Sequence, residues 1–148
     1  MHKAVTLIEL LIVISVMLIL TGLAIFNLRS IEGRANIDQA KTIVVAALRE
    51  AQSNSRAVID DQSWGVHLEA NKITIFADSG SGFNPADSKN KAKLLGDNIT
   101  CENALSGGGN DILFKKRTGQ TDQPGAITLS DGSGAKEITI NSEGSINY

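Results

Sequence analysis

The first thirty residues constrain the fold most, because they place one acidic side chain at the edge of a long apolar run. From Leu10 to Leu28 the sequence has no charged residue. About nineteen residues of α-helix extend roughly 28 Å, close to the hydrocarbon thickness of a bilayer. The segment therefore predicts a membrane-spanning helix. Glu9 lies at its N-terminal edge, and a charged side chain within a membrane span costs about 2.5–3.5 kcal/mol on insertion scales.

Cleavage of the chain after Ala4 would create a cation that could pair with this carboxylate. The new α-amino group at Val5 would lie about one helical turn from Glu9, but within one chain it points along the helix axis. The Glu9 of a neighbouring chain, staggered by about one turn, is better placed to meet it. The segment thus predicts assembly of several chains through their N-terminal helices.

The run KAVTLIELLIV resembles the N-terminal signal of type IV pilins and pseudopilins. The resemblance is specific over Thr6–Val13, although Ala4 stands where the family usually has Gly and Val5 where it usually has Phe or Met. It implies that a prepilin peptidase cleaves between Ala4 and Val5, that Val5 is N-methylated, and that Thr6 and Glu9 act in assembly.

The same resemblance implies a location and a set of partners. The subunit would be held in the cytoplasmic (inner) membrane by a single span, with its head outside the cytoplasm. It would then enter an extracellular or periplasmic filament of a type IV pilus, a type II secretion system or a competence system. The implied partners are other pilin or pseudopilin subunits, the prepilin peptidase and an assembly platform in the membrane.

Two other interpretations of this segment remain open. A conventional secretory signal would have its basic region at His2 and Lys3 and a small-x-small cleavage site at residues 22–24. The mature chain would then begin at Ile25. A plain single-pass anchor would explain the apolar span but not Glu9.

Beyond the apolar run the hydrophobic pattern becomes that of an amphipathic helix. Small and apolar residues recur at steps of three and four, as on one face of an α-helix: Ile37, Ala40, Val44, Ala47, Leu48, Ala51 and Ser55. We therefore expect one helix from Val5 to Arg56. Residues 1–4 would be a leader, residues 5–31 the membrane and assembly segment, and residues 32–148 a globular head that begins with the amphipathic helix 32–57.

From Ser63 onward the period becomes two, which is typical of β-strands. A hairpin is expected from residues 64–68 and Ile73–Ala77, followed by a polar surface loop over Asp78–Lys93. Further strands are expected at Asn98–Glu102, Asp111–Lys115, Ala126–Ser130, Glu137–Asn141 and Ser145–Tyr148. A helix followed by strands predicts an α+β fold, with an antiparallel β-sheet in region 63–148 curled against the long helix. The resemblance implies that this fold is of the type IV pilin kind.

Several stretches of the head resemble minor pseudopilins of the H type and fimbrial minor pilins of the T type. These stretches are ALREAQSNSRAV, SWGVHL, ITIFAD and ILFKKRTGQ. The resemblance implies a head like that of a minor subunit, and the chain could be a pilin, a minor pilin or a pseudopilin.

The sequence offers little that is typical of catalysis, and we expect no enzyme activity, cofactor or metal. His2 and His67 do not form a ligand pair, and Cys101 has no second cysteine with which to form an intrachain disulfide. We expect Cys101 to be a small buried side chain. The acids at residues 60–61, 78 and 87 lack the alternating pattern of a calcium loop, which favours solvated turns.

Lys115, Lys116 and Arg117 form the one concentrated group of cations, within a chain of 14 basic and 16 acidic residues. Clustered cations can contact the phosphates of DNA, but beside a strand they also protect a sheet edge from further pairing. The leading prediction is thus a structural filament subunit. The alternative is a membrane-anchored or tip-located binding module, an adhesin or a DNA-binding protein, that uses the head.

Overall fold

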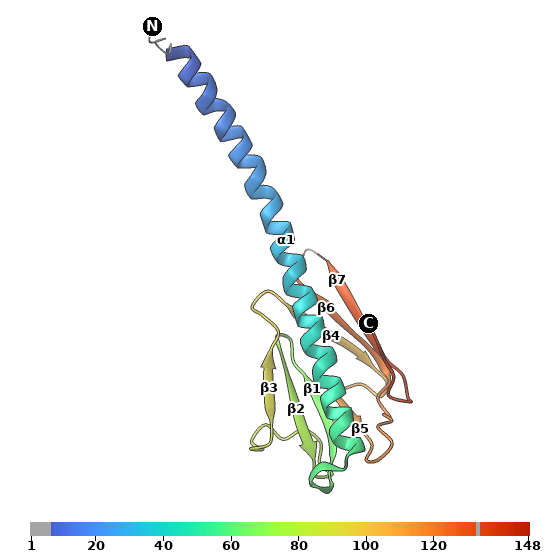
Figure 1. Ribbon diagram of the computed structural model, residues 1–148. Coiled ribbons are helices and arrows are strands. Elements are labelled where there is room, and N and C mark those ends of the chain that lie inside the picture. Colours follow the sequence, from blue (N-terminus) through green and yellow to red (C-terminus); the bar gives the residue numbers. More distant parts are fainter. Residues whose placement is uncertain (1–6, 133) are drawn as a thin grey trace.

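A single long helix, α1, runs through the whole molecule, and one half of it protrudes from a β-rich head (Figure 1). The computed structural model describes residues 7–132 and 134–148, and for residues 22–35 only the course of the backbone. Helix α1 comprises Leu7–Arg56. The expected helix is confirmed from Leu7 to Arg56, whereas the expected leader, Val5 and Thr6 lie outside the described residues.

The second half of α1 buries one face against the head. All seven positions that the helical period placed on that face are buried. Leu48, Ala51 and Ser55 are each 0% exposed, whereas Arg49 and Arg56 on the other side are exposed. Packing of this apolar face against the head therefore stabilises the second half of α1, in addition to the intrinsic helix propensity of its residues.

The strands form two four-stranded antiparallel sheets. The first has the order β3-β2-β1-β5 and the second β4-β6-β7-β8. The strands are β1 Ser63–Leu68, β2 Lys72–Asp78, β3 Lys91–Leu94, β4 Thr100–Leu105, β5 Asp111–Phe114, β6 Gly125–Ser130, β7 Ala135–Ile140 and β8 Ile146–Asn147. A short 3-10 helix, η1 Ile59–Asp61, connects α1 to β1.

The core lies between α1 and the inner faces of both sheets, with α1 in front of the sheets in Figure 1. Val66 and Ile75 of the first sheet and Ile127 and Ile138 of the second are all 0% exposed. The α+β class and the antiparallel pairing are as predicted. The expectation of one sheet is wrong, because β4 pairs with β6 and not with β3.

Strand β3 is the second correction, since the sequence predicted a loop over Asp78–Lys93. Lys91 and Lys93 gave this segment a polar character, yet it pairs with β2 over its full length. Both lysines bind the Glu50 carboxylate on α1, at 2.8 and 3.1 Å. A charged strand is stable at this edge because α1 supplies the compensating charge.

The rest of the expected loop is also more ordered than a solvated surface segment. The Phe83 ring stacks on His67 with 4.0 Å between ring centroids and meets Phe76 edge-on at 5.4 Å. Phe76 is consequently only 1% exposed, although it lies on the outer face of β2. The loop thus covers part of the first sheet's outer face.

Within the residues that could be searched, no helix is both long enough and apolar enough to cross a membrane. The expected span Leu10–Leu28 lies partly outside the residues whose side chains are described, which resume only at Asn36 after Thr21.

Candidate assembly surfaces

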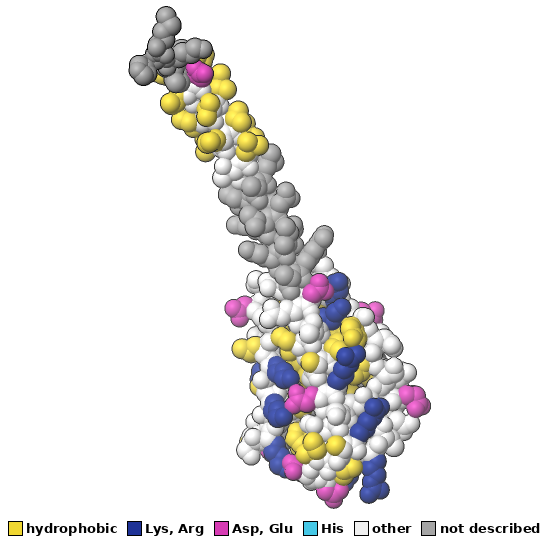
Figure 2. Space-filling view, in the orientation of Figure 1, with side chains coloured by type: hydrophobic (Ala, Val, Ile, Leu, Met, Phe, Trp, Pro, Cys, Tyr) yellow, Lys and Arg dark blue, Asp and Glu magenta, His cyan; other side chains and the backbone are white. Residues whose placement is uncertain are grey.

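The protruding half of α1 is the largest apolar surface among the described residues. Every large apolar side chain from Leu7 to Leu20 is between 48% and 81% exposed. These side chains occupy nearly every position of about four helical turns and therefore lie on all sides of the helix. The yellow atoms along its upper part in Figure 2 show those on the visible side. A helix that is apolar on all sides requires a surrounding apolar environment, and exposed apolar patches of this size mark interaction surfaces.

Glu9 lies in the first turn of α1. A carboxylate at this end of a helix is favoured by the helix dipole. The cleavage positions Ala4 and Val5, and the assembly residue Thr6, lie outside the described residues. The structure therefore leaves the pairing of Glu9 with a neighbouring N-terminal amine as a prediction.

The C-terminal end of α1 holds two loops and strand β1 of the head through buried polar contacts. The Gln52 Nε2 group donates to the carbonyl oxygens of Gly119 and Gly144, at 2.9 and 2.7 Å. The Ser55 hydroxyl accepts from the Trp64 backbone N–H at 2.8 Å. Sequence analysis missed Gln52, because nothing near it in the sequence shows that its side chain is buried or that it binds the carbonyl groups of two distant loops.

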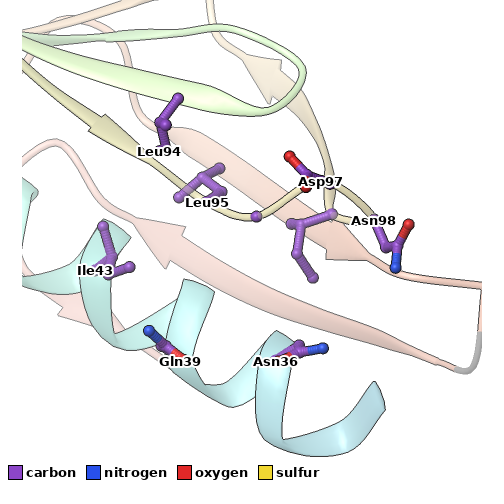
Figure 3. Close-up of a pocket in the computed structure, with 9 residues that line it drawn as sticks. Asn36, Gln39, Ile43, Leu94, Leu95, Asp97 and Asn98 are labelled. Carbon is purple, nitrogen blue, oxygen red and sulfur yellow. The ribbon is translucent and has the colours of Figure 1, made fainter. Parts of the chain in front are cut away.

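A groove runs between α1 and the connection from β3 to β4 (Figure 3). Asn36, Gln39 and Ile43 line it from the helix, facing residues 94–99. Leu94 at its rim is 72% exposed. The lining combines apolar and amide side chains with one carboxylate, Asp97, and holds no second catalytic group beside it, so the groove is suited to contact rather than to catalysis.

The cluster Lys115–Arg117 lies in the turn after β5, which ends at Phe114 and not at Lys115 as expected. Lys115 forms an ion pair with Asp122 at 2.7 Å, and Lys116 forms one with Asp61 at 3.1 Å. Arg117 has a left-handed backbone, with φ of 68°, and its N–H donates to the Ser55 carbonyl. Two of the three cations are thus paired with carboxylates, which weakens the case for a DNA-binding patch.

Cys101 is buried, as predicted, with 8% exposure. Burial, with a smaller contribution from the Glu102 charge, raises the pKa of its thiol to about 11. A thiol with this pKa is protonated at neutral pH and does not act as a nucleophile.

The acidic turn residues have structural roles. Asp60 pairs with Lys89 at 2.8 Å, and the Asp78 carboxylate accepts from the backbone N–H groups of Gly80 and Gly82. Among the described residues, no group of three histidine, cysteine or acidic side chains could hold a metal ion. The His67 ring has two other contacts: it stacks on the Phe83 ring and it lies against the Asp111 carboxylate.

Comparison with known proteins gives one informative match. No family model matches the chain, and neither does any curated protein. Among solved structures, the fold is similar to that of the minor pseudopilin EpsH from the Type 2 Secretion System of Vibrio cholerae. The TM-score is 0.53 and the identity 12%, and the match covers 73% of this chain and 90% of that chain. At this identity the match shows a pseudopilin-like fold.

Proposed function

We propose that this chain is a structural subunit of a pilin-like filament of the type II secretion kind. The observation that carries the proposal is helix α1 itself. Its second half is packed into the head, and its first half presents apolar side chains on all sides. The fold shared with a minor pseudopilin supports the same assignment. The apolar half would be held first by the cytoplasmic membrane and then by the same helices of neighbouring subunits.

Processing and pairing complete the proposal. A prepilin peptidase would cleave after Ala4, Val5 would be N-methylated, and the Val5 amine would meet Glu9 of a neighbouring subunit. Such a pair would favour assembly, because a carboxylate at the edge of the lipid is costly in an isolated chain and is compensated when a cation approaches. The partners would be other pilin-like subunits and the membrane assembly platform.

Intact-mass analysis of the full chain, extracted from membranes after coexpression with a prepilin peptidase, tests this proposal. We expect the loss of residues 1–4 and the mass of one added methyl group. Cells without the peptidase provide the control, as does Ala4→Leu, which removes the small residue before the cleavage site and should leave the chain uncut. A mature chain that begins at Ile25 would instead identify a conventional secretory signal and contradict the proposal.

The contacts of the head give little support to the alternative of a DNA-binding tip. Lys115 and Lys116 are paired with Asp122 and Asp61, and phosphate binding would have to displace these carboxylates.

A further inference from the structure

The exposed side of α1 carries two cations that are not neutralised by the head. Lys41 and Arg49 are separated by eight residues, about 12 Å along the helix. Both contact the Tyr148 ring, at 5.3 and 5.2 Å from its centroid, and Arg49 also donates to the Tyr148 hydroxyl. Among the described residues, neither cation lies within ion-pair distance of a carboxylate. The exposed positions between them, Thr42 and Ala46, are small.

Further cations surround this helix face. Lys91 and Lys93 share the single Glu50 carboxylate, and Lys136 binds Asp38 of α1. Figure 2 shows Lys and Arg side chains gathered on this face of the head. We call Lys41, Arg49, the small helix residues between them and the Tyr148 ring that contacts both cations the basic helix face.

The second sheet presents an acidic row on its outer side. Glu102 of β4 pairs with Thr128 of β6, which pairs with Glu137 of β7, so the three side chains lie in one row across the sheet. The two glutamates are two strand spacings, about 10 Å, apart. Both are exposed, and no described cation pairs with either.

This acidic row points away from the core and is surrounded by small side chains. The neighbouring residues Cys101, Ile127 and Ile138 point inward and are buried. The other outward residues of the three strands are all small: Thr100, Ala104, Ala126, Ser130, Ala135 and Thr139. We call the row and these residues the acidic sheet face.

We propose that the basic helix face of one copy of this chain docks onto the acidic sheet face of a second copy. The charged groups of Lys41 and Arg49 lie 5.3 and 5.2 Å from the centroid of one ring, so they are at most about 10.5 Å apart, comparable to the two strand spacings, about 10 Å, that separate the glutamates. Tyr148, which contacts both cations and is 58% exposed, would lie against the small outward side chains of the sheet. The two faces lie on different sides of the head, so the contact is heterologous and can repeat from copy to copy.

The inference rests on the proposed function, because it names the head contact of a filament. Opposite charges across an interface set register and exclude wrong partners more than they add affinity. The apolar helices would therefore supply most of the association, and the two faces would fix how neighbouring heads meet.

Charge reversal in the full chain tests the contact. Two differently tagged copies are coexpressed, extracted in mild detergent and copurified at low and at high salt. We expect K41E/R49E in both copies to lower copurification at low salt by about tenfold, because like charges then face each other. We expect the same of E102K/E137K. Mixing K41E/R49E copies with E102K/E137K copies should restore copurification, since the reversed faces are complementary again. High salt should reduce the differences.

K72E/K115E provides the matched control, because it reverses two lysines that pair with Glu69 and Asp122 away from both faces. This control should copurify as the wild type does. If the reversed variants copurify normally and still enter filaments, the proposed contact is wrong while the proposed function stands. If copurification of the wild type is lost on nuclease treatment, the basic helix face binds nucleic acid and the contact is also wrong. If wild-type copies neither copurify nor form filaments, both proposals fail.

Discussion

The two halves of α1 differ in what covers them, although they form one continuous helix. Leu48 in the second half is 0% exposed within the head, whereas Leu18 in the first half is 69% exposed. Both side chains are leucines, so the difference comes from their surroundings. The second half finds its partner in the same chain. The side chains of the first half have no such cover among the described residues, and we expect lipid and neighbouring subunits to provide it.

The largest expected effect comes from replacing one leucine in each half of α1 and comparing the free energies of unfolding. Leu48→Ala removes a fully buried side chain and should lower the free energy of unfolding of the head by about 2–5 kcal/mol. Leu18→Ala should change it by less than about 0.5 kcal/mol. Trp64, the one tryptophan of the chain and 4% exposed, reports unfolding of the head by its fluorescence in urea. Equal losses in the two variants would contradict the division of α1 into two halves.

Gln52 shows a second difference between the two halves, because the packed half also binds two loops of the head through hydrogen bonds. Gln52→Leu leaves the carbonyls of Gly119 and Gly144 buried without their donor. We expect a loss of about 1–3 kcal/mol in the same Trp64 measurement. Ser53→Ala, at an exposed neighbouring position, provides the control and should be close to neutral. An unchanged stability of Gln52→Leu would show that these hydrogen bonds contribute nothing.

Glu50 should give a smaller effect that depends on pH. The hydrogen bond from Lys91 lowers the pKa of the Glu50 carboxyl from its ordinary value of 4.5, and Lys93 contributes to the same shift. Burial opposes this shift. The charged form therefore stabilises the head above about pH 4.5, and this stabilisation is lost as the pH falls through the lowered pKa. Glu50→Gln should cost up to about 1 kcal/mol at pH 7, because the pair is partly exposed.

The same unfolding measurement at a pH below the lowered pKa provides the control. There wild type and Glu50→Gln should have nearly equal stabilities, since both then carry an uncharged side chain. A difference that grows on acidification would contradict the assignment.

Lys116 should give the smallest effect. Its ion pair with Asp61 is exposed, and such pairs contribute between 0 and about 1 kcal/mol. Lys116→Ala should therefore barely change the stability of the head and should enter filaments at the wild-type level. Incorporation is measured as the share of protein in the sheared filament fraction. A strong defect in incorporation would indicate that the cluster Lys115–Arg117 contacts a partner.

Local patterns predicted the helix and most of the strands. Residues 37–55 could be assigned to one buried helix face because their spacing follows the helical period, and β1 and β2 follow the period of two. Strand β3 was missed because its two lysines look solvated in the sequence. Their partner Glu50 lies about forty residues earlier, so no local window contains the information.

The arrangement of strands in two sheets and the contacts of Gln52 were beyond sequence reasoning for the same physical reason. The pairing of β4 with β6 and the hydrogen bonds from Gln52, which span 67 and 92 residues, depend on long-range packing. The predicted assembly signal around Glu9 is the opposite case. It is a local motif whose proposed partner, an N-terminal amine, belongs to a neighbouring subunit, so the motif is visible in the sequence while the pairing remains a prediction to be tested on assembled subunits.

The incorporation of Glu9 variants into sheared filaments tests the central proposal most directly. Glu9→Gln keeps the shape but removes the charge, and Glu9→Leu makes the single chain more compatible with lipid while it leaves a neighbour's amine without its carboxylate. Both variants should be inserted and cleaved like the wild type, yet most of the protein should remain in the membrane fraction. If Glu9→Leu enters filaments as well as the wild type does, the carboxylate has no role in assembly and the proposed pairing is wrong.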